Sequence, residues 1–233
     1  MINQSLQEKT QQYLVLTGMA LLIGLLVGAI DMIFGQGLLL IGDFRSQHWP
    51  LILFLALVGL IIVYLYKRFG GKASKGMGLI FDVGHAREEK IPLVLVPLIM
   101  LTTWMSHLFG GSVGREGVAV QIGATLSHRF ARHIKIADAS RIFLMTGMAA
   151  GFAGLFQTPL AATFFALEVL TVGELQLIAL YPALIASIVA SFTSHTLGLE
   201  KFAVPLRETL SWTPETLIKV TLLGLAFGLA GKL

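Results

Sequence analysis

Gly110-Gly111-Ser112-Val113-Gly114-Arg115-Glu116-Gly117-Val118-Ala119-Val120-Gln121 is a glycine-rich turn that carries an adjacent arginine and glutamate. It lies between two stretches that are apolar enough to enter a membrane. An ionised carboxylate in a bilayer core costs several kcal/mol, so an acid retained at that depth usually has a functional role. We therefore interpret Glu116 as a residue that handles protons, and the backbone around it as a binding surface for an anion.

The composition is that of a membrane protein. Of the 233 residues, 55% are hydrophobic and only 13% are charged, whereas a soluble domain carries about 25% charged residues. Several apolar runs reach spanning length, which predicts an all-α polytopic membrane protein. The net charge of +4 comes from basic residues that gather in loops, so no nucleic-acid partner is expected. The six histidines are scattered without ligand spacing, which predicts no metal or other cofactor.

The apolar runs predict the spans along the chain. They cover residues 13–34, 51–66, 91–109, 118–133, 137–154, 159–170 and 175–192, with an unfinished run at 215–233. Residues 1–12 are interpreted as a polar cytoplasmic lead-in, residues 35–50 as a loop, and residues 194–214 as an extracellular linker. Asp31 is expected as a charge at the outer end of the first span. Because the chain stops inside an apolar run, we expect a piece of a longer transport protein.

The basic residues predict the orientation of the chain, because cytoplasmic loops are enriched in Lys and Arg. With the N-terminus inside, the inner loops and ends hold 12 of the 17 basic residues. These are Lys9, Lys67, Arg68, Lys72, Lys75, Arg87, Lys90, Arg129, Arg132, Lys135, Arg141 and Lys232. The pattern predicts a multi-pass protein of the cell membrane with a cytoplasmic N-terminus.

Three turns marked by glycine or proline precede expected helices, at residues 76–80, 114–121 and 156–159. The first N–H groups of a helix have no intrahelical partners and carry the positive end of the helix dipole, so they can bind an anion. Three such helix starts in one membrane layer favour an anion path over a cation path. Gly147 and Gly151, like Gly224 and Gly228, have the small-xxx-small spacing that predicts close helix packing.

Gly114-Arg115-Glu116-Gly117, followed by Val120-Gln121-Ile122-Gly123, resembles the G-R/K-E-G-P…V-Q-I-G signature of the CLC family of anion channels and anion/proton antiporters. The resemblance continues through residues 146–153, 156–161 and 165–168 in the right order, and it covers about residues 76–170. It implies a CLC-type bundle of tilted, broken helices, in a homodimer with one pore per subunit. Each subunit has two inverted halves, so residues 13–193 would form the first half and residues 215–233 would begin the second.

The resemblance also assigns roles to residues. Glu116 aligns with the external gating glutamate, which lies in the anion path when ionised and leaves it when protonated. Arg115 is its structural neighbour, and the backbone of the turn at Phe156 faces the anion. The expected anion pathway comprises Gly76, Met77, Gly78, Gly114, Arg115, Gly117, Val118, Phe156 and Gln157. The dimer surface would lie largely on residues 159–170 and 175–192.

Two departures from the family pattern indicate one branch. Most CLC proteins have G-S-G-I-P at the first anion turn, with the serine hydroxyl on chloride, whereas this turn reads Gly76-Met77-Gly78-Leu79-Ile80. The proline two residues after the gating glutamate is replaced by Val118. Both changes resemble the CLC-F branch of bacterial fluoride/proton antiporters. The inner proton glutamate of chloride antiporters aligns with Val169, and its neighbour Glu168 is a possible inner proton site.

The expected function is therefore export of fluoride in exchange for protons, which is secondary active transport and not an enzymatic reaction. A chloride/proton antiporter or a chloride channel is the alternative within the family. A remote alternative of another class is an intramembrane serine hydrolase, because residues 110–114 match the pattern G-x-S-x-G. That reading requires Ser112 within hydrogen-bond reach of a base such as His107 or His128.

Overall fold

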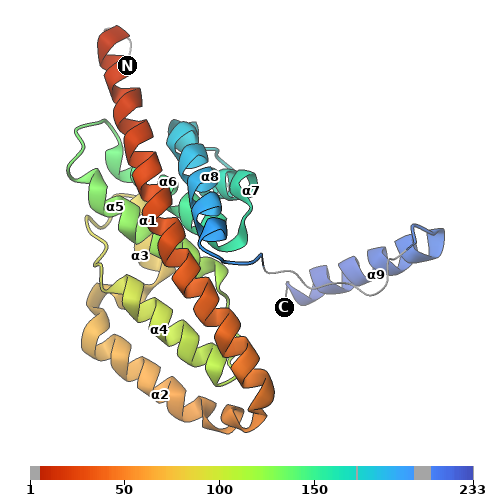
Figure 1. Cartoon of the computed structure of the whole chain (residues 1–233). Helices are drawn as coiled ribbons and strands as arrows, with labels where there is room; N and C mark the ends of the chain where they lie inside the picture. The colour runs from red at the N-terminus through yellow and green to blue at the C-terminus, as the bar shows by residue number, and fades with distance from the viewer. Residues whose placement is uncertain (1–5, 172, 202–210, 233) are drawn as a thin grey trace. The chain divides into compact units, whose positions relative to one another are not determined.

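The computed structural model of the chain describes residues 6–171, 173–201 and 211–232. The chain forms two units, residues 1–201 and residues 202–233. Every regular element within the described ranges is a helix, which confirms the predicted all-α class (Figure 1). The first unit contains α1 (Leu6–Gln47), η1 (Trp49–Phe54), α2 (Leu55–Leu65), η2 (Tyr66–Gly70), η3 (Gly71–Lys75), α3 (Met77–Gly84), α4 (Leu95–Leu108), α5 (Glu116–Ala131), α6 (Ala139–Phe156), α7 (Pro159–Glu168), η4 (Leu177–Ala179) and α8 (Leu180–Thr196). The second unit contains α9 (Pro214–Ala230).

Helices of spanning length confirm the multi-pass membrane class. Among the described residues, four helical runs are long and apolar enough to cross a bilayer: Thr10–Gln47, Trp49–Gly84, Ala139–Phe156 and Leu177–Thr196. Two shorter apolar helices, Leu95–Leu108 and Pro159–Glu168, accompany them. Mixed long and short helices are the architecture expected of a CLC-type bundle.

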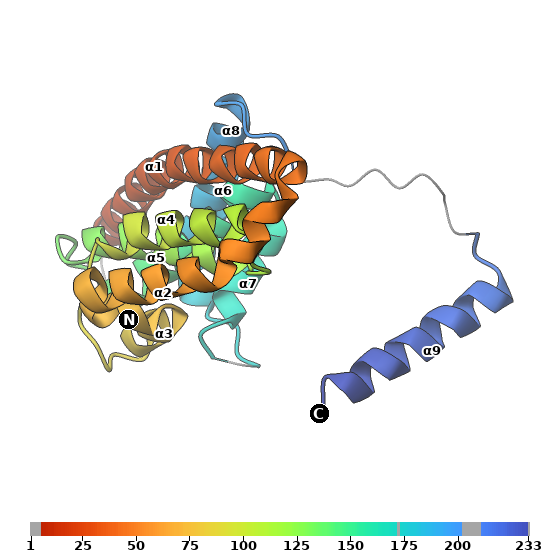
Figure 2. The ribbon, with the colours of Figure 1, turned by 90° about the horizontal axis from the view of Figure 1, so that it is seen from below.

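The core of the first unit is built around α6, which packs against α1, α5, α7 and α8 (Figure 2). Small residues bring the backbones of α5 and α6 into contact. A Cβ atom on Gly147 would overlap the carbonyl of Gly123, and one on Gly151 would overlap the carbonyl of Ala119. The predicted role of Gly147 and Gly151 in close packing is thus confirmed. In α9, a Cβ on Gly224 or Gly228 would meet no described atom within 4 Å, so their packing role stays a prediction.

The first helix differs from the prediction. Because α1 runs from Leu6 to Gln47, the predicted loop at residues 35–50 is wrong for residues 35–47, and the polar lead-in is helical from Leu6. The glycines at positions 35 and 37 serve packing, and they do not end the helix. A Cβ on Gly35 would lie 2.6 Å from a methyl group of Leu199, and one on Gly37 would lie 2.6 Å from the ring of Trp104.

Asp31 is a second correction. It does not lie at a helix end, because it occupies the interior of α1 and is completely buried. At the other end of the unit, α8 extends to Thr196, so the predicted outer linker begins a few residues later than residue 194. Residues 202–210 of that linker lie outside the described residues.

Segments predicted to lie on the inner side gather in space. One cavity is lined by Lys72, Lys90, Arg129 and Arg132, which come from three separate parts of the chain. A second cavity is lined by Gln11 and Gln12 of α1 together with residues 133–137, which brings the start of α1 beside another basic segment. The arrangement agrees with the distribution of charge on which the predicted topology depends.

Candidate anion and proton site

Glu116 is the first residue of α5, and its side chain is exposed. Its Oε2 accepts a hydrogen bond from the backbone N–H of Arg115 at 3.0 Å, so the carboxylate folds back over the start of its own helix. A Cβ at Gly114 would lie 3.0 Å from that oxygen, so a side chain at this position would crowd the carboxylate. The N-terminus of a helix favours negative charge. The Glu116 carboxylate therefore occupies the kind of position that a bound anion would take.

Arg115 joins this turn to the end of α6. Its guanidinium lies 5.6 Å from the centre of the Phe156 ring, a distance at which a cation and an aromatic face attract. The Phe156 ring in turn lies 5.0 Å from that of Phe152 on the same helix. Arg115 thus places the predicted turn at residues 156–159 beside Glu116, which agrees with its interpretation as a structural neighbour.

Gln157 holds the turn after α6 in place. Its backbone is left-handed, with φ of 54°, and its Nε2 donates to the carbonyl of Leu199 at 2.7 Å. The side chain that was predicted to line the anion path is therefore engaged with the segment that follows α8. Its backbone remains part of the turn beside Phe156.

The first predicted turn lies near α5 at Gln121, a residue of the family motif that was not predicted to belong to the site. Gln121 is buried, and its Nε2 donates to the carbonyl of Gly117 at 3.0 Å. A Cβ on Gly76 would lie 3.6 Å from its Oε1, which has no hydrogen-bond partner among the described residues. Gln121 therefore connects the turn at Gly76 with the first turn of α5, where Gly117 and the buried Val118 lie.

Each of the three predicted turns marks a helix start, but α3 and α5 begin inside the turns that were expected to precede them. α3 begins at Met77 after Gly76, whose φ of 55° suits glycine, and α7 begins at Pro159. The N-cap residues of α3, α5 and α7 make no side-chain cap hydrogen bond. By contrast, Thr213 accepts the N–H of Thr216 at 3.2 Å at the start of α9. Met77 is half-buried and Gly78 is exposed at the first turn. The first turns of these three helices thus keep N–H groups that could donate hydrogen bonds to an anion.

Glu168 is not brought beside Glu116. It is exposed at the last residue of α7, which has 10 residues. At 1.5 Å per residue, α7 is about 15 Å long. Leu170, two residues further on, abuts Gly84 at the end of α3. Glu168 therefore lies at the opposite end of α7 from the turn that contacts Arg115.

Ser112 lacks the machinery of a hydrolase in the described part of the chain. The Nδ1 atom of His107 is 2.9 Å from the carbonyl of Thr103, and the Nε2 atom of His128 is 2.8 Å from the hydroxyl of Ser140. Neither histidine is hydrogen-bonded to Ser112. The turn also joins two helices, α4 and α5, whereas the hydrolase elbow joins a strand to a helix.

Lysines organise the charged loop after α3. Lys72 Nζ lies 2.6 Å from Glu88, and Lys75 Nζ lies 2.9 Å from Asp82 and 3.5 Å from Glu88. The hydrogen bond from Lys72 lowers the pKa of Glu88 from its ordinary value, with Lys75 acting in the same direction. These exposed pairs order the segment that connects the first anion turn to α4.

Broken helices, membrane-spanning length and helix starts that meet beside a carboxylate define a polytopic membrane protein with a candidate anion site. A family model described as "Voltage gated chloride channel" matches residues 58–233. The chain therefore belongs to the voltage gated chloride channel family, the CLC family that its motifs resemble.

Among curated relatives, the chain is similar to a "Chloride/fluoride channel protein" of Pseudomonas syringae pv. tomato, with 35% identity over 213 residues. That match covers 91% of this chain and 47% of the relative. A "Voltage-gated ClC-type chloride channel ClcB" of Salmonella typhimurium is 29% identical over 154 residues, which cover 66% of this chain and 34% of the relative. The chain thus spans about half, or less, of the length of these relatives.

Two solved structures share the fold. A CLC-type fluoride/proton antiporter superposes with a TM-score of 0.84 at 47% identity, over 98% of this chain and 57% of that one. A slow cyanobacterial Cl⁻/H⁺ antiporter superposes with a TM-score of 0.71 at 23% identity, over 93% of this chain and 54% of that one. The second likeness supports the fold alone.

Proposed function

We propose that this protein is a fluoride/proton antiporter that exports fluoride in exchange for protons. The observation that carries the proposal is the 47% identity to a CLC-type fluoride/proton antiporter across 98% of this chain. Met77 at the first anion turn and Val118 after the glutamate support the same branch, because both replace residues typical of other CLC proteins.

The mechanism follows from the position of the Glu116 carboxylate. When ionised, the carboxylate folds over the start of α5 through the Arg115 N–H, as an anion would. When Glu116 binds a proton it loses the charge that this position favours, and it yields the helix start to fluoride. An anion and the ionised side chain thus compete for one place, and this competition links fluoride movement to proton binding.

The surrounding residues have supporting roles. Gly76, Met77 and Gly78 provide one wall of the anion path, with Gly114, Gly117 and the backbone at Phe156 on the other sides. Arg115 holds the Phe156 turn in register with Glu116. Glu168, exposed at the end of α7, is the candidate for proton exchange at the inner end of the pathway.

The rest of the arrangement is also part of the proposal. The protein would reside in the cell membrane with its N-terminus in the cytoplasm, and residues 13–193 would form the first of two inverted halves. It would act as a homodimer, and α7 and α8 are suited to the interface. They expose large apolar side chains, namely Leu160, Phe164, Ile188 and Phe192.

Paired flux measurements test the proposal. The purified protein is reconstituted in liposomes loaded with fluoride or with chloride, and anion release and proton uptake are recorded together. Fast fluoride release with proportionate proton uptake, and little chloride release, is expected. Fast chloride release would favour the chloride antiporter or channel suggested by the Salmonella relative. Met77→Ser, which restores the serine of other family members, should increase chloride release if the first turn selects the anion.

A further inference from the structure

Asp31 is a buried acid that the proposed mechanism does not use. It lies in the interior of α1, and its relative exposure is 0%. Its carboxylate presses against Gly154 in the last turn of α6, where an added Cβ would overlap Oδ2 and would lie 3.2 Å from the Asp31 Cβ. The absence of a side chain at position 154 is what gives the carboxyl group its place.

Glycines on either side of Asp31 enclose it further. One turn earlier, a Cβ on Gly28 would lie 2.9 Å from the Cβ of Thr193 on α8. One turn later, a Cβ on Gly35 would lie 3.2 Å from a methyl group of Leu155 on α6. α1 is therefore in close contact with both α6 and α8 around this carboxyl group, which agrees with Figures 1 and 2.

Neither oxygen of Asp31 has a hydrogen-bond partner among the described residues. The ion pairs of the described chain do not include Asp31 either. Several titratable or charged residues belong to the elements packed around it. They are Arg141 on α6, Tyr181 and His195 on α8, His107 on α4, and Glu116, His128 and Arg129 on α5. Glu200 and Lys201 belong to the segment after Leu199. An ionised carboxylate without a partner in such a place is strongly disfavoured, so the group neutralises itself by binding a proton.

We propose that Asp31 is a proton-binding site that keeps its proton through the transport cycle, and that the neutral acid joins α1 to the last turn of α6. A protonated carboxyl group has an O–H donor, and the last carbonyl groups of a helix have no intrahelical partners. Asp31 thus acts as a positioning residue. Gly154 is two residues before Phe156, whose ring contacts Arg115 beside Glu116. The inference concerns the acid itself and holds whichever anion the protein carries.

Ionisation of Asp31 would place a charge between α1 and α6 and displace the turn at Phe156. Transport is therefore expected to fall reversibly at alkaline pH as the proton leaves. Asp31→Asn keeps the shape of the side chain and cannot ionise, so it should lose this alkaline inhibition. At neutral pH its fluoride flux and its proton-to-fluoride ratio should match those of the unmodified protein. Asp43→Asn, at an exposed position of the same helix, is the matched control.

Infrared spectroscopy tests the protonation state directly in the unmodified protein, and a folded Asp31→Asn variant assigns the band to position 31. Carbon-13 labelling of aspartate shifts the carboxyl bands of aspartate away from those of glutamate. A labelled band of a protonated carboxyl group is therefore expected, and it should be absent in Asp31→Asn.

Two results would overturn the inference. The first is the absence of a protonated-aspartate band at neutral pH in the purified protein, since Asp31 would then be ionised. The second is a folded Asp31→Asn variant with a changed proton-to-fluoride ratio, since Asp31 would then exchange its proton during transport. A flux assay that shows chloride transport in place of fluoride would contradict the proposed function and leave both of these measurements valid.

Discussion

At the scale of single residues, Gln121 is the side chain that connects the anion turns. Its amide donates a hydrogen bond to the carbonyl of Gly117, and its Oε1 lies 3.6 Å from the place of a Cβ on Gly76, so it lies beside two of the three predicted turns. Its Oε1 is buried and has no hydrogen-bond partner within the described part of the chain. A buried polar atom that lacks a hydrogen bond lowers stability, so retention of this residue is better explained by the geometry of the site than by stability.

Gln121→Leu should therefore separate stability from function. Leucine removes the unpaired oxygen together with the bond to Gly117, so the free energy of unfolding should change by no more than about 1 kcal/mol. Loss of one positioning hydrogen bond, about 0.5–1.5 kcal/mol, should weaken fluoride binding about two- to tenfold. The half-saturating fluoride concentration of flux measures the effect, with Gln11→Leu as control. Unchanged half-saturation would show that Gln121 does not position the site.

Glu88 makes a pH-dependent contribution to the loop after α3. Because its pKa in the folded protein is lowered by Lys72 and then Lys75, its ion pairs stabilise the fold above the unfolded pKa of about 4.3. That stabilisation is lost as the pH falls through the lower, folded value. Thermal unfolding of Glu88→Gln should thus differ from that of the parent protein at neutral pH and converge with it in acid. Glu89→Gln, at the exposed neighbouring position, should show no such convergence.

At the scale of helices, the contact between α5 and α6 depends on glycine. Any side chain at position 147 would collide with the backbone at Gly123 and with the Cβ of Ser127, 2.5 Å away. Gly59 on α2 is a matched position, since a Cβ there would meet no described atom within 4 Å. Alanine substitutions at these two glycines therefore distinguish the effect of helix packing on stability from the effect of helix propensity.

Gly147→Ala should lower the free energy of unfolding by about 1–3 kcal/mol, the usual cost of overpacking a core. Gly59→Ala should instead raise it by up to about 1 kcal/mol, because alanine favours a helix over glycine. Reversible unfolding in mixed detergent micelles measures both values. If the two variants lost the same stability, the α5–α6 contact would not depend on Gly147.

Hydrophobic runs and turn residues predicted most of the helices, but they did not predict all of the helix ends. The start of α7 at Pro159 followed from proline, whereas the start of α3 at Met77, inside a predicted turn, and the continuation of α1 through Gly35 and Gly37 did not. In the local sequence, a glycine suggests the end of a helix. Only the contacts with Leu199 and Trp104 show that these glycines face packed neighbours. Asp31 was misplaced for the same reason, since a helix assumed to end near residue 34 places it near solvent.

The residues of the site that belong to a sequence motif were predictable. Glu116, Arg115 and the turn at Phe156 came together as expected. Gln157 lies at the site, but its side chain is bonded to Leu199, a contact between residues 42 positions apart that no local pattern encodes. The link from Gln121 to Gly76 is of the same kind. Positions fixed by tertiary contacts are those that the sequence alone could not assign.

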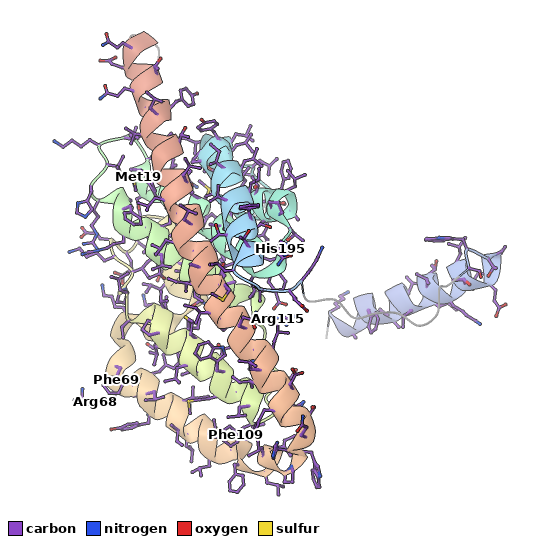
Figure 3. All side chains as sticks on the ribbon, viewed as in Figure 1. Met19, Arg68, Phe69, Phe109, Arg115 and His195 are labelled. Atoms are coloured by element: carbon purple, nitrogen blue, oxygen red, sulfur yellow. The ribbon has the colours of Figure 1, made fainter. Side chains whose placement is uncertain are left out.

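At the scale of the first unit, basic residues from separate segments line one cavity together with Phe69. The guanidinium of Arg68 lies 5.4 Å from the centre of the Phe69 ring, and both residues are labelled in Figure 3. Arg45 lies close to Gly110, in a region predicted to face outward. This chain contains no cysteine, so single cysteines can report the topology. Ser46→Cys should react with a membrane-impermeant maleimide in intact cells, and Lys135→Cys should react only after the membrane is opened. The reverse pattern would refute a cytoplasmic N-terminus.

The central claim is that Glu116 couples the anion to the proton. The most direct measurement is simultaneous fluoride release and proton uptake by Glu116→Gln in fluoride-loaded liposomes, beside the parent protein and Glu200→Gln, a control at an exposed position. We expect proton uptake to fall to background in Glu116→Gln, because an amide neither ionises nor carries a proton, while the control keeps its coupling. Proton uptake by a folded Glu116→Gln at the parent ratio would contradict the account.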